Sequence, residues 1–411
     1  MRLPGKIIDN YFHALTNANF RYFWLGQCVS LIGTWMQTIG QSWLVYTLTD
    51  SPLLLGVFAA MQFLPITTLS LFAGVIVDRY PKKTILYVTQ SVSMLLALIL
   101  AALVFTNTVR YEYLLVLAVL LGITNSIDIP ARQSFLIEIA GRDDLMNAIA
   151  LNSMTFNLAK ILGPSLGAVL MAALGAGWCF LINGISFIAV LIGLLRIKVD
   201  PYVRPKVSTK IIREIMDGLR YIYKNRILLQ GILTTLGMGI FAFNYSVLLP
   251  VFVKNVLHQE AAAYGVLMAA LGVGSIIGAL VVSGRSKSGP RMGIVIISAL
   301  LVGVLYILHG LFIQYAVIII LLAGIGLFSI TFSTTLNTIL QVNSSNEYRG
   351  RVMSVYSLVF SGATPIGGLF TGIAISGSGI SETFRLSGIL IICMVLGVSV
   401  LFFKKRDPFH K

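Results

Sequence analysis

Long apolar runs alternate with short polar breaks along almost the whole chain. A helix needs about 20 apolar residues to cross a bilayer core of about 30 Å, and most of these runs are long enough. Only helices and closed barrels satisfy their own backbone in lipid, and runs of this length are not barrel strands. The pattern therefore predicts an all-α polytopic membrane protein with twelve transmembrane helices, at 20–48, 53–77, 84–106, 112–131, 148–173, 179–196, 227–253, 262–283, 294–313, 316–342, 352–374 and 384–403.

The lysine and arginine residues indicate how the helices are oriented. If both termini lie in the cytoplasm, 26 of the 30 cations fall on the cytoplasmic side. Arg110, Lys254 and Arg385 fall on the opposite side, and Lys160 lies within the fifth apolar run. This bias is typical of the positive-inside rule. We therefore expect a multi-pass protein with both termini cytoplasmic.

Composition agrees with a membrane protein. Charged residues make up 11% of the chain, against about 25% in a soluble domain. The net charge of +15 is dispersed over short loops, which is the ordinary consequence of topology and does not indicate nucleic-acid binding. Residues 1–19 are polar and mixed, so we expect them to stay as a cytoplasmic lead-in and not to form a cleavable signal peptide.

The sequence contains no pattern typical of an enzyme. Cys28, Cys179 and Cys393 all lie in apolar runs, so neither a disulfide framework nor a metal site is expected. There is no metal-ligand cluster, no Gly-Lys phosphate loop and no Ser/His/Asp arrangement among the four histidines. We expect no catalytic residues, no metal and no cofactor.

One long polar interruption, at 196–226, divides the runs into six and six. Within it, apolar residues share one helical face, at Ile211, Ile215, Leu219 and Ile222. We interpret this segment as an amphipathic helix at the cytoplasmic surface, either a connector anchored to lipid or a regulatory site. The predicted domains are a lead-in (1–19), an N-terminal six-helix bundle (20–196), a linker with the amphipathic helix (197–226), a C-terminal six-helix bundle (227–403) and a cytoplasmic tail (404–411).

Gly/Pro-broken helices occur at matching places in the two halves, a pattern typical of secondary transporters. The most specific motifs are Asn19–Gln27, Gly33–Gln37, Gln41–Tyr46, Asp78–Arg79, Asp128–Arg132 and Lys160–Pro164. On these motifs, nearly the whole chain resembles the major facilitator superfamily, and within it the bacterial drug- and siderophore-exporter group that includes the enterobactin exporter. The resemblance implies two pseudo-symmetric six-helix bundles in the bacterial cytoplasmic (inner) membrane.

Five residues are predicted to act in gating. Asp78 ends the second span at the cytoplasmic side and should interact with the positive N-terminus of another helix. The resemblance implies a latch between the halves, with Arg79 beside it and close helix packing at Gly74; the alternative is a charge that only sets topology. Asp128 and Arg132 are four residues apart, near the cytoplasmic end of the fourth span, and are expected to join this charge cluster. Proton carriage by Asp128 is a further alternative.

Lys160 lies near the middle of the fifth span, where an ionisable side chain is costly and usually faces a cavity or a partner. Binding of an anionic substrate, a response to protonation and pairing with polar side chains all stay open. The Gly/Pro positions nearby should allow close packing against the other half. The predicted hinge and packing residues are Gly163, Pro164, Gly167, Pro365, Gly367 and Gly368.

Polar side chains recur at steps of three and four along the first span, which places them on one helix face that lipid would not tolerate. Spans seven and ten carry similar residues. The resemblance implies that these spans line a central cavity; interhelical hydrogen bonding is the alternative. The predicted cavity residues are Gln27, Ser30, Thr34, Gln37, Gln41, Lys160, Thr234, Asn244, Tyr245, Ser333 and Asn337.

We therefore expect a secondary active transporter that exports an amphipathic organic molecule, drug-like or siderophore-like, by alternating access. Proton antiport is implied by the resemblance alone. The first span carries no buried carboxylate, and no proton relay is visible in the sequence. The expected partners are a small-molecule substrate, the lipid bilayer and protons, with no nucleic acid, and the protein is expected to be a monomer. A lysolipid or lipid flippase and a non-transporting membrane receptor are the alternatives.

Overall fold

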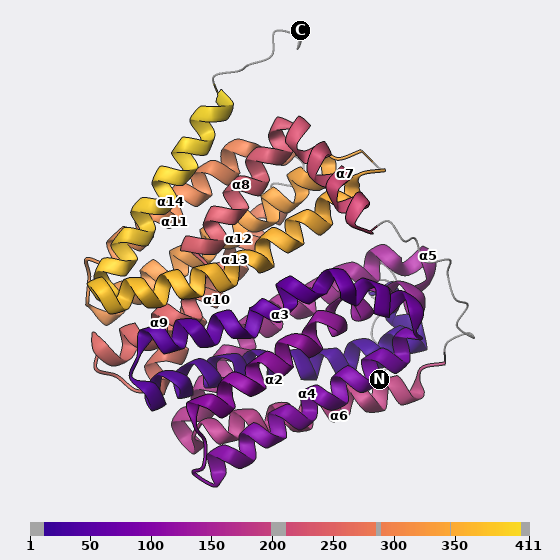
Figure 1. The fold of residues 1–411 in the computed structure, drawn as a ribbon, viewed down its shortest axis with the longest axis horizontal. Helices are drawn as coiled ribbons and strands as arrows, with labels where there is room; N and C mark the ends of the chain where they lie inside the picture. Colours follow the sequence, from indigo (N-terminus) through magenta and orange to yellow (C-terminus); the bar gives the residue numbers. More distant parts are fainter. Residues whose placement is uncertain (1–11, 199–210, 285–288, 346, 404–411) are drawn as a thin grey trace. The chain divides into compact units, whose positions relative to one another are not determined.

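The computed structural model describes residues 12–198, 211–284, 289–345 and 347–403. Within these ranges every regular element is a helix (Figure 1). The helices are η1 (His13–Thr16), α2 (Ala18–Thr49), α3 (Pro52–Arg79), α4 (Lys82–Phe105), α5 (Tyr111–Leu174), α6 (Ala176–Arg196), α7 (Ile211–Lys224), α8 (Arg226–Phe241), α9 (Tyr245–Asn255), α10 (Ala261–Gly284), α11 (Met292–His309), α12 (Tyr315–Val342), α13 (Arg349–Ser378) and α14 (Ile380–Phe403).

Eleven helical segments of the described chain are long and apolar enough to cross a membrane. They correspond to the second to twelfth predicted spans. The first predicted span is α2, which is 32 residues long and therefore long enough to cross. Its regularly spaced polar residues lower its mean hydropathy, and it is not among the eleven. The prediction of an all-α polytopic membrane protein is confirmed.

The fourth and seventh predicted spans differ most from the structure. The fourth does not end at residue 131 but continues to Gly141, where a φ of 73° turns the chain within α5. Glycine adopts this left-handed backbone without the penalty that a Cβ imposes. The seventh predicted span is interrupted between α8 and α9, around Ala242–Asn244.

The chain folds into two compact units. The described residues of the first unit lie within Met1–Leu48 and Leu64–Ser208, and those of the second unit lie within Thr49–Phe63 and Thr209–Lys411. In the first unit, Phe20 and Phe23 of α2 belong to an apolar core with Phe135 of α5 and Leu194 of α6. The Phe23 and Phe135 rings meet edge to face with centroids 5.5 Å apart, a favoured aromatic geometry. The predicted domain bounds stay a prediction.

In the second unit, α10 and α12 cross at very close range. A Cβ built on Gly274 of α10 would overlap the carbonyl oxygen of Ala323, and one on Gly326 of α12 would overlap that of Leu271. Small residues let helix backbones approach in this way, and they favour van der Waals packing where lipid provides no hydrophobic driving force between helices. Glycine is therefore required on both sides of this crossing.

Candidate functional site

An ion pair lies inside the first unit, on the first half of α5. The Arg132 guanidinium donates to Asp128 Oδ2 through Nε, at 3.1 Å, and through Nη2. The two residues are four positions apart, so one helix face carries both. Asp128 is only 1% exposed. A buried carboxylate is stable only where charge and hydrogen bonds compensate its lost hydration.

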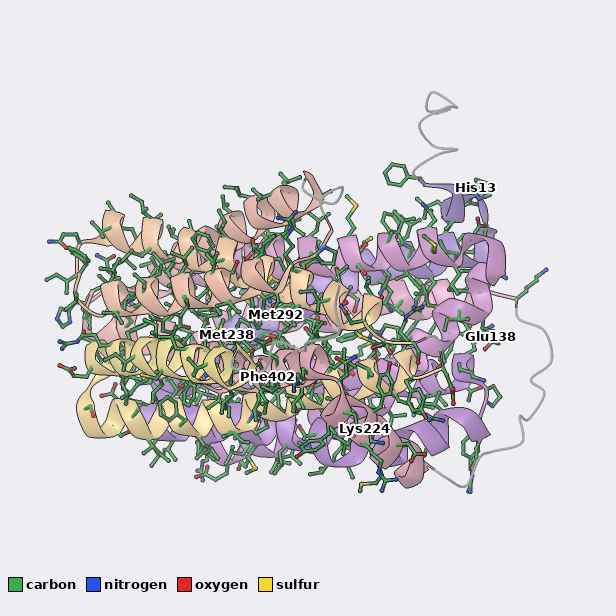
Figure 2. The ribbon with its side chains drawn as sticks, turned by 90° about the horizontal axis from the view of Figure 1, so that it is seen from above. His13, Glu138, Lys224, Met238, Met292 and Phe402 are labelled. Carbon is green, nitrogen blue, oxygen red and sulfur yellow. The ribbon has the colours of Figure 1, made fainter. Side chains whose placement is uncertain are left out.

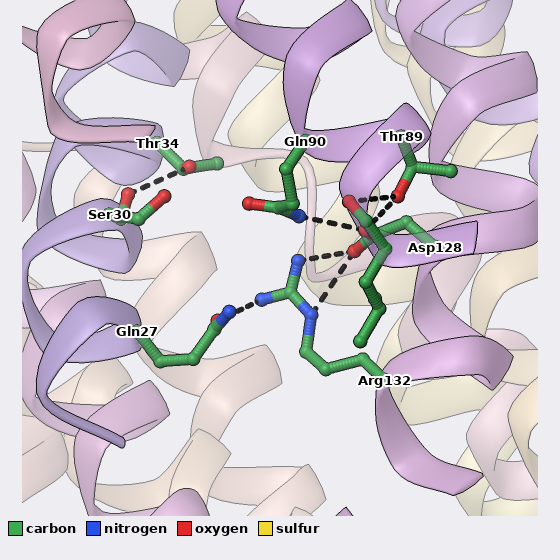
Figure 3. A network of polar contacts seen from close by, with 8 residues as sticks. Gln27, Ser30, Thr34, Thr89, Gln90, Asp128 and Arg132 are labelled. Carbon is green, nitrogen blue, oxygen red and sulfur yellow. Dashed lines mark hydrogen bonds and ion pairs between the residues drawn. The ribbon is translucent and has the colours of Figure 1, made fainter. Parts of the chain in front are cut away.

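Two side chains of α4 also donate hydrogen bonds to this carboxylate (Figure 3). The Thr89 hydroxyl and the Gln90 side-chain amide both donate to Asp128 Oδ1, each at 2.7 Å. Thr89 and Gln90 are themselves buried. Four donor groups, on Arg132, Thr89 and Gln90, therefore surround the Asp128 carboxylate.

The same network reaches α2 through Gln27. Arg132 Nη1 donates to Gln27 Oε1, which orients the Gln27 amide because a guanidinium can only donate. Two buried polar atoms, Gln27 Nε2 and Gln90 Oε1, have no hydrogen-bond partner among the described residues. Unpaired buried groups of this kind are costly and usually mark a functional site or an ordered water.

The helix that carries this network differs in length from the sequence prediction. Because the helix continues to Gly141, Asp128 lies about 20 Å along the helix from that bend, at a rise of 1.5 Å per residue. The helix is thus longer on this side of Asp128 than the sequence pattern predicts, and the position of Asp128 near the cytoplasmic end of the span stays a prediction. Arg79 is exposed at the end of α3 and is not part of the network. The side chain of Asp78 lies outside the described residues, so its gating role stays a prediction.

Lys160 lies midway along the second half of α5, beside an aromatic pair. Its ammonium nitrogen is 5.8 Å from the centroid of the Trp35 ring, which meets Phe156 edge to face. The lysine is exposed within the structure, and in the described part of the chain no carboxylate forms an ion pair with it. The contact with Trp35 has the geometry of a cation–π interaction.

Two glycines hold this part of α5 against α2. A Cβ on Gly163 would come within 2.7 Å of the Ile32 carbonyl oxygen, and one on Gly167 within 2.8 Å of the Met36 side chain. The close packing predicted at these glycines is thus made to a helix of the same unit. Pro164 lies between them within the helix. This packing fixes Lys160 one turn from Gly163, next to Trp35.

The remaining polar residues of α2 lie mostly inside the first unit. Ser30, Gln37 and Gln41 are buried. Thr34 is partly buried and donates to the Ser30 carbonyl at 2.9 Å, and Gln37 Oε1 accepts a hydrogen bond of 2.7 Å from Asn183 of α6. The structure therefore joins α2 to α5 and α6 through this stripe, and cavity lining by these residues stays a prediction.

The predicted cavity residues of the second unit do not form one network. Thr234 and Asn244 donate to carbonyls of their own helical region, at Gln230 and Ile240. The Tyr245 hydroxyl is 3.2 Å from that of Ser329 on α12. Farther along α12, Ser333 is partly buried, and Asn337 accepts from Gln341.

The predicted hinge residues of α13 pack at two places in the second unit. A Cβ on Gly367 would lie 2.7 Å from the Asn244 side chain, beside the break between α8 and α9. Gly368 faces Gly56 of α3, and Pro365 is buried within α13. In contrast, a Cβ on Gly74 would meet no atom of the described structure within 4 Å, and the close approach to the other half at this glycine stays a prediction.

Sequence reasoning missed three residues that bond to predicted site residues: Thr89 and Gln90, which donate to Asp128, and Asn183, which donates to Gln37. Each is a polar residue inside an otherwise apolar span. In lipid, such residues are expected to face a protein neighbour. The spacing of Thr89, Gln90 and Ser93 along α4 was the available signal, and Ser93 is likewise buried.

A family model described as "Transmembrane secretion effector" matches residues 10–407. The chain is 29% identical to the staphyloferrin A transporter of Staphylococcus aureus, over 92% of this chain and 94% of that protein. It is 24% identical to the multidrug efflux pump Tap of Mycolicibacterium fortuitum, with 90% and 92% covered. It is also 25% identical to the enterobactin exporter EntS of Shigella boydii, with 96% and 95% covered.

Solved structures share the fold at lower sequence identity. A bacterial homologue of the human lysosomal transporter Spinster, in an inward-facing and unoccupied conformation, superposes with a TM-score of 0.74. The two sequences are 15% identical, and the comparison covers 95% of this chain and 98% of the other. At this identity the similarity concerns the fold alone.

Proposed function

Since the chain belongs to the transmembrane secretion effector family of the major facilitator superfamily, we propose that it exports an amphipathic organic molecule in exchange for protons. Members of this group are transporters and not enzymes, and those similar to this chain export siderophores and drugs. The chain is a multi-pass membrane transporter. Its proposed orientation has both termini in the cytoplasm of a bacterium, and it works by alternating access.

The observation that carries the proposal is the buried ion pair between Asp128 and Arg132. Ionisable side chains inside a membrane are rare and are concentrated on ion and substrate pathways. This pair lies mid-helix, is tied to two other helices, and has unpaired amide atoms beside it. These features support a site where a proton or a polar cargo group binds.

In this proposal, proton binding at Asp128 changes how three helices are held together. A protonated carboxyl no longer balances the Arg132 charge, so the guanidinium that also donates to Gln27 of α2 loses its ion pair. The links between α2, α4 and α5 then depend on protonation. Such a local change can bias a transporter between two packed arrangements.

We propose that Lys160 binds an anionic group of the cargo. Lys160 is an exposed residue and forms no ion pair with a carboxylate among the described residues. Lys160→Ala should therefore reduce export of an anionic hydroxycarboxylate siderophore, because a charge-assisted hydrogen bond is lost. The loss of about 1.5–3 kcal/mol corresponds to about a 10- to 150-fold weaker interaction. Transport by inverted vesicles would be measured for this siderophore and for the lipophilic cation ethidium.

The matched control is Lys198→Ala, which removes an exposed lysine outside the membrane spans. It should leave transport of both compounds unchanged, and Lys160→Arg should retain most of the siderophore transport. If Lys160→Ala exported the siderophore at the wild-type rate, Lys160 would not bind the cargo.

The function itself is tested in proteoliposomes that contain a trapped pH dye. The assay compares siderophores, ethidium and a fluorescent lysolipid. A pH change triggered by a siderophore or by ethidium is the expected result. Movement of either compound with no pH change would refute proton exchange, and movement of the lysolipid alone would identify a flippase instead.

A further inference from the structure

Helix α7 packs directly on the first turn of α13 in the second unit. The rings of Tyr221 and Tyr348 stack in parallel, with centroids 4.4 Å apart and an angle of 6°. The backbone N–H of Ser345 donates to the Tyr221 hydroxyl at 3.1 Å, and this hydrogen bond lowers the pKa of the Tyr221 phenol. On α13, the Arg351 guanidinium lies 5.0 Å from the Tyr348 ring centroid.

Backbone contacts make this attachment close. A Cβ on Gly218 would lie 3.0 Å from the Arg351 Cβ, so α7 approaches α13 at a residue without a side chain. Ile222, one turn farther along, is only 2% exposed. These contacts hold one face of α7 against protein. The start of α13 is therefore in direct contact with α7.

The opposite face of α7 is exposed and has two sectors. Met216, Leu219 and Tyr223 are 58%, 44% and 77% exposed and form an apolar sector. Arg220 and Lys224 are also exposed. At 100° per residue around the helix, they form a basic sector next to the apolar one. The side chain of Lys224 stands at the end of α7 (Figure 2). Adjoining apolar and basic sectors are typical of helices that lie in a membrane interface.

The covalent connection to α8 fixes the depth of α7. Only Asn225 separates the end of α7 from the first residue of the membrane span α8, Arg226. Asn225 caps α8, since its side chain accepts from the backbone N–H groups of Ile227 and Leu228. The end of α7 is thus two residues, or at most about 7 Å, from the end of a span. This places it at the level of the lipid headgroups.

We propose that α7 binds anionic phospholipid headgroups through Arg220 and Lys224, and that this binding is transmitted to α13 through the Tyr221–Tyr348 stack. The charge of the two cations complements an anionic leaflet, and their long side chains reach headgroups while the apolar sector enters the interface. The negative charge of Asp217, which is half-buried on α7, is outweighed by the two exposed cations. Each cation near such a surface strengthens binding about fivefold.

The test is hydrogen exchange of the full-length protein in POPC vesicles and in POPC vesicles that contain POPG. In the wild type, POPG should slow exchange at least fivefold in residues 216–224 and also slow it in residues 348–356. Arg220→Gln combined with Lys224→Gln should remove both effects. The control Arg110→Gln, which removes an exposed cation outside α7, should keep both.

A second variant separates lipid binding from its transmission. Tyr221→Leu removes the aromatic stack and leaves the exposed face intact, so POPG should still protect 216–224 but no longer 348–356. Identical exchange in the two vesicle types, or a full POPG response in the double variant, would refute lipid binding. Protection of 216–224 without 348–356 in the wild type would refute transmission. Adding inorganic phosphate to POPC vesicles should have no effect; protection by phosphate would show a site for free anions instead.

Discussion

Asp128→Asn should abolish the pH change that accompanies cargo movement. An amide does not bind a proton in the physiological range, and it cannot balance the charge of Arg132. Asparagine keeps the size of the side chain, so the contacts to Thr89 and Gln90 can be retained in part. Breaking a buried ion pair costs about 3–5 kcal/mol. Because Arg132 is 23% exposed, we expect Asp128→Asn to lower the free energy of unfolding by an amount near the lower end of this range.

The measurement is the signal of a trapped pH dye in proteoliposomes, together with the thermal midpoint of the purified variant. Asp50→Asn is the matched control because it removes a largely exposed aspartate that pairs with Lys254 at 2.9 Å. Exposed ion pairs contribute little to stability, at about 0–1 kcal/mol. Asp50→Asn should therefore still show the pH change that accompanies cargo movement and be nearly as stable as the wild type. Full proton coupling in Asp128→Asn would rule out Asp128 as the proton site.

Gly274→Ala should strongly destabilise the second unit. The added methyl would overlap the Ala323 carbonyl oxygen, a backbone atom that cannot move away as the end of a flexible side chain can. The helices α10 and α12 must then separate along their crossing. Overpacking of a tight site typically costs about 1–3 kcal/mol and sometimes more, and we expect a loss of about 3 kcal/mol.

Thermal unfolding in detergent measures this effect, with Gly397→Ala as the control. Gly397 also lies within a membrane-spanning helix, but a Cβ built there meets no atom within 4 Å. Both variants gain the same methyl group and the same helix propensity. If they unfolded at the same temperature, the α10–α12 crossing would not depend on the small size of glycine.

The sequence motifs identified the transporter group, and comparison with relatives confirmed that prediction. The candidate site was predicted only in part. Asp128 and Arg132 could be paired from their spacing alone, because a four-residue separation places two side chains on one helix face. The end of their helix was predicted ten residues too early, because the helix continues through the polar residues that follow 131 to Gly141. Local polarity did not reveal that these residues remain helical.

The sequence by itself determined the class of the protein and its helices, because these depend on properties that are local along the chain. A run of about 20 apolar residues in lipid must satisfy its own backbone, and a helix does so within the run. Only the tertiary structure decided which polar residues meet. Gln27 and Arg132 are 105 positions apart, and Asp128 is 38 and 39 positions from its two partners on α4. No local rule fixes how separate helices rotate and pack, so the network around Asp128 follows from the packing of α2, α4 and α5.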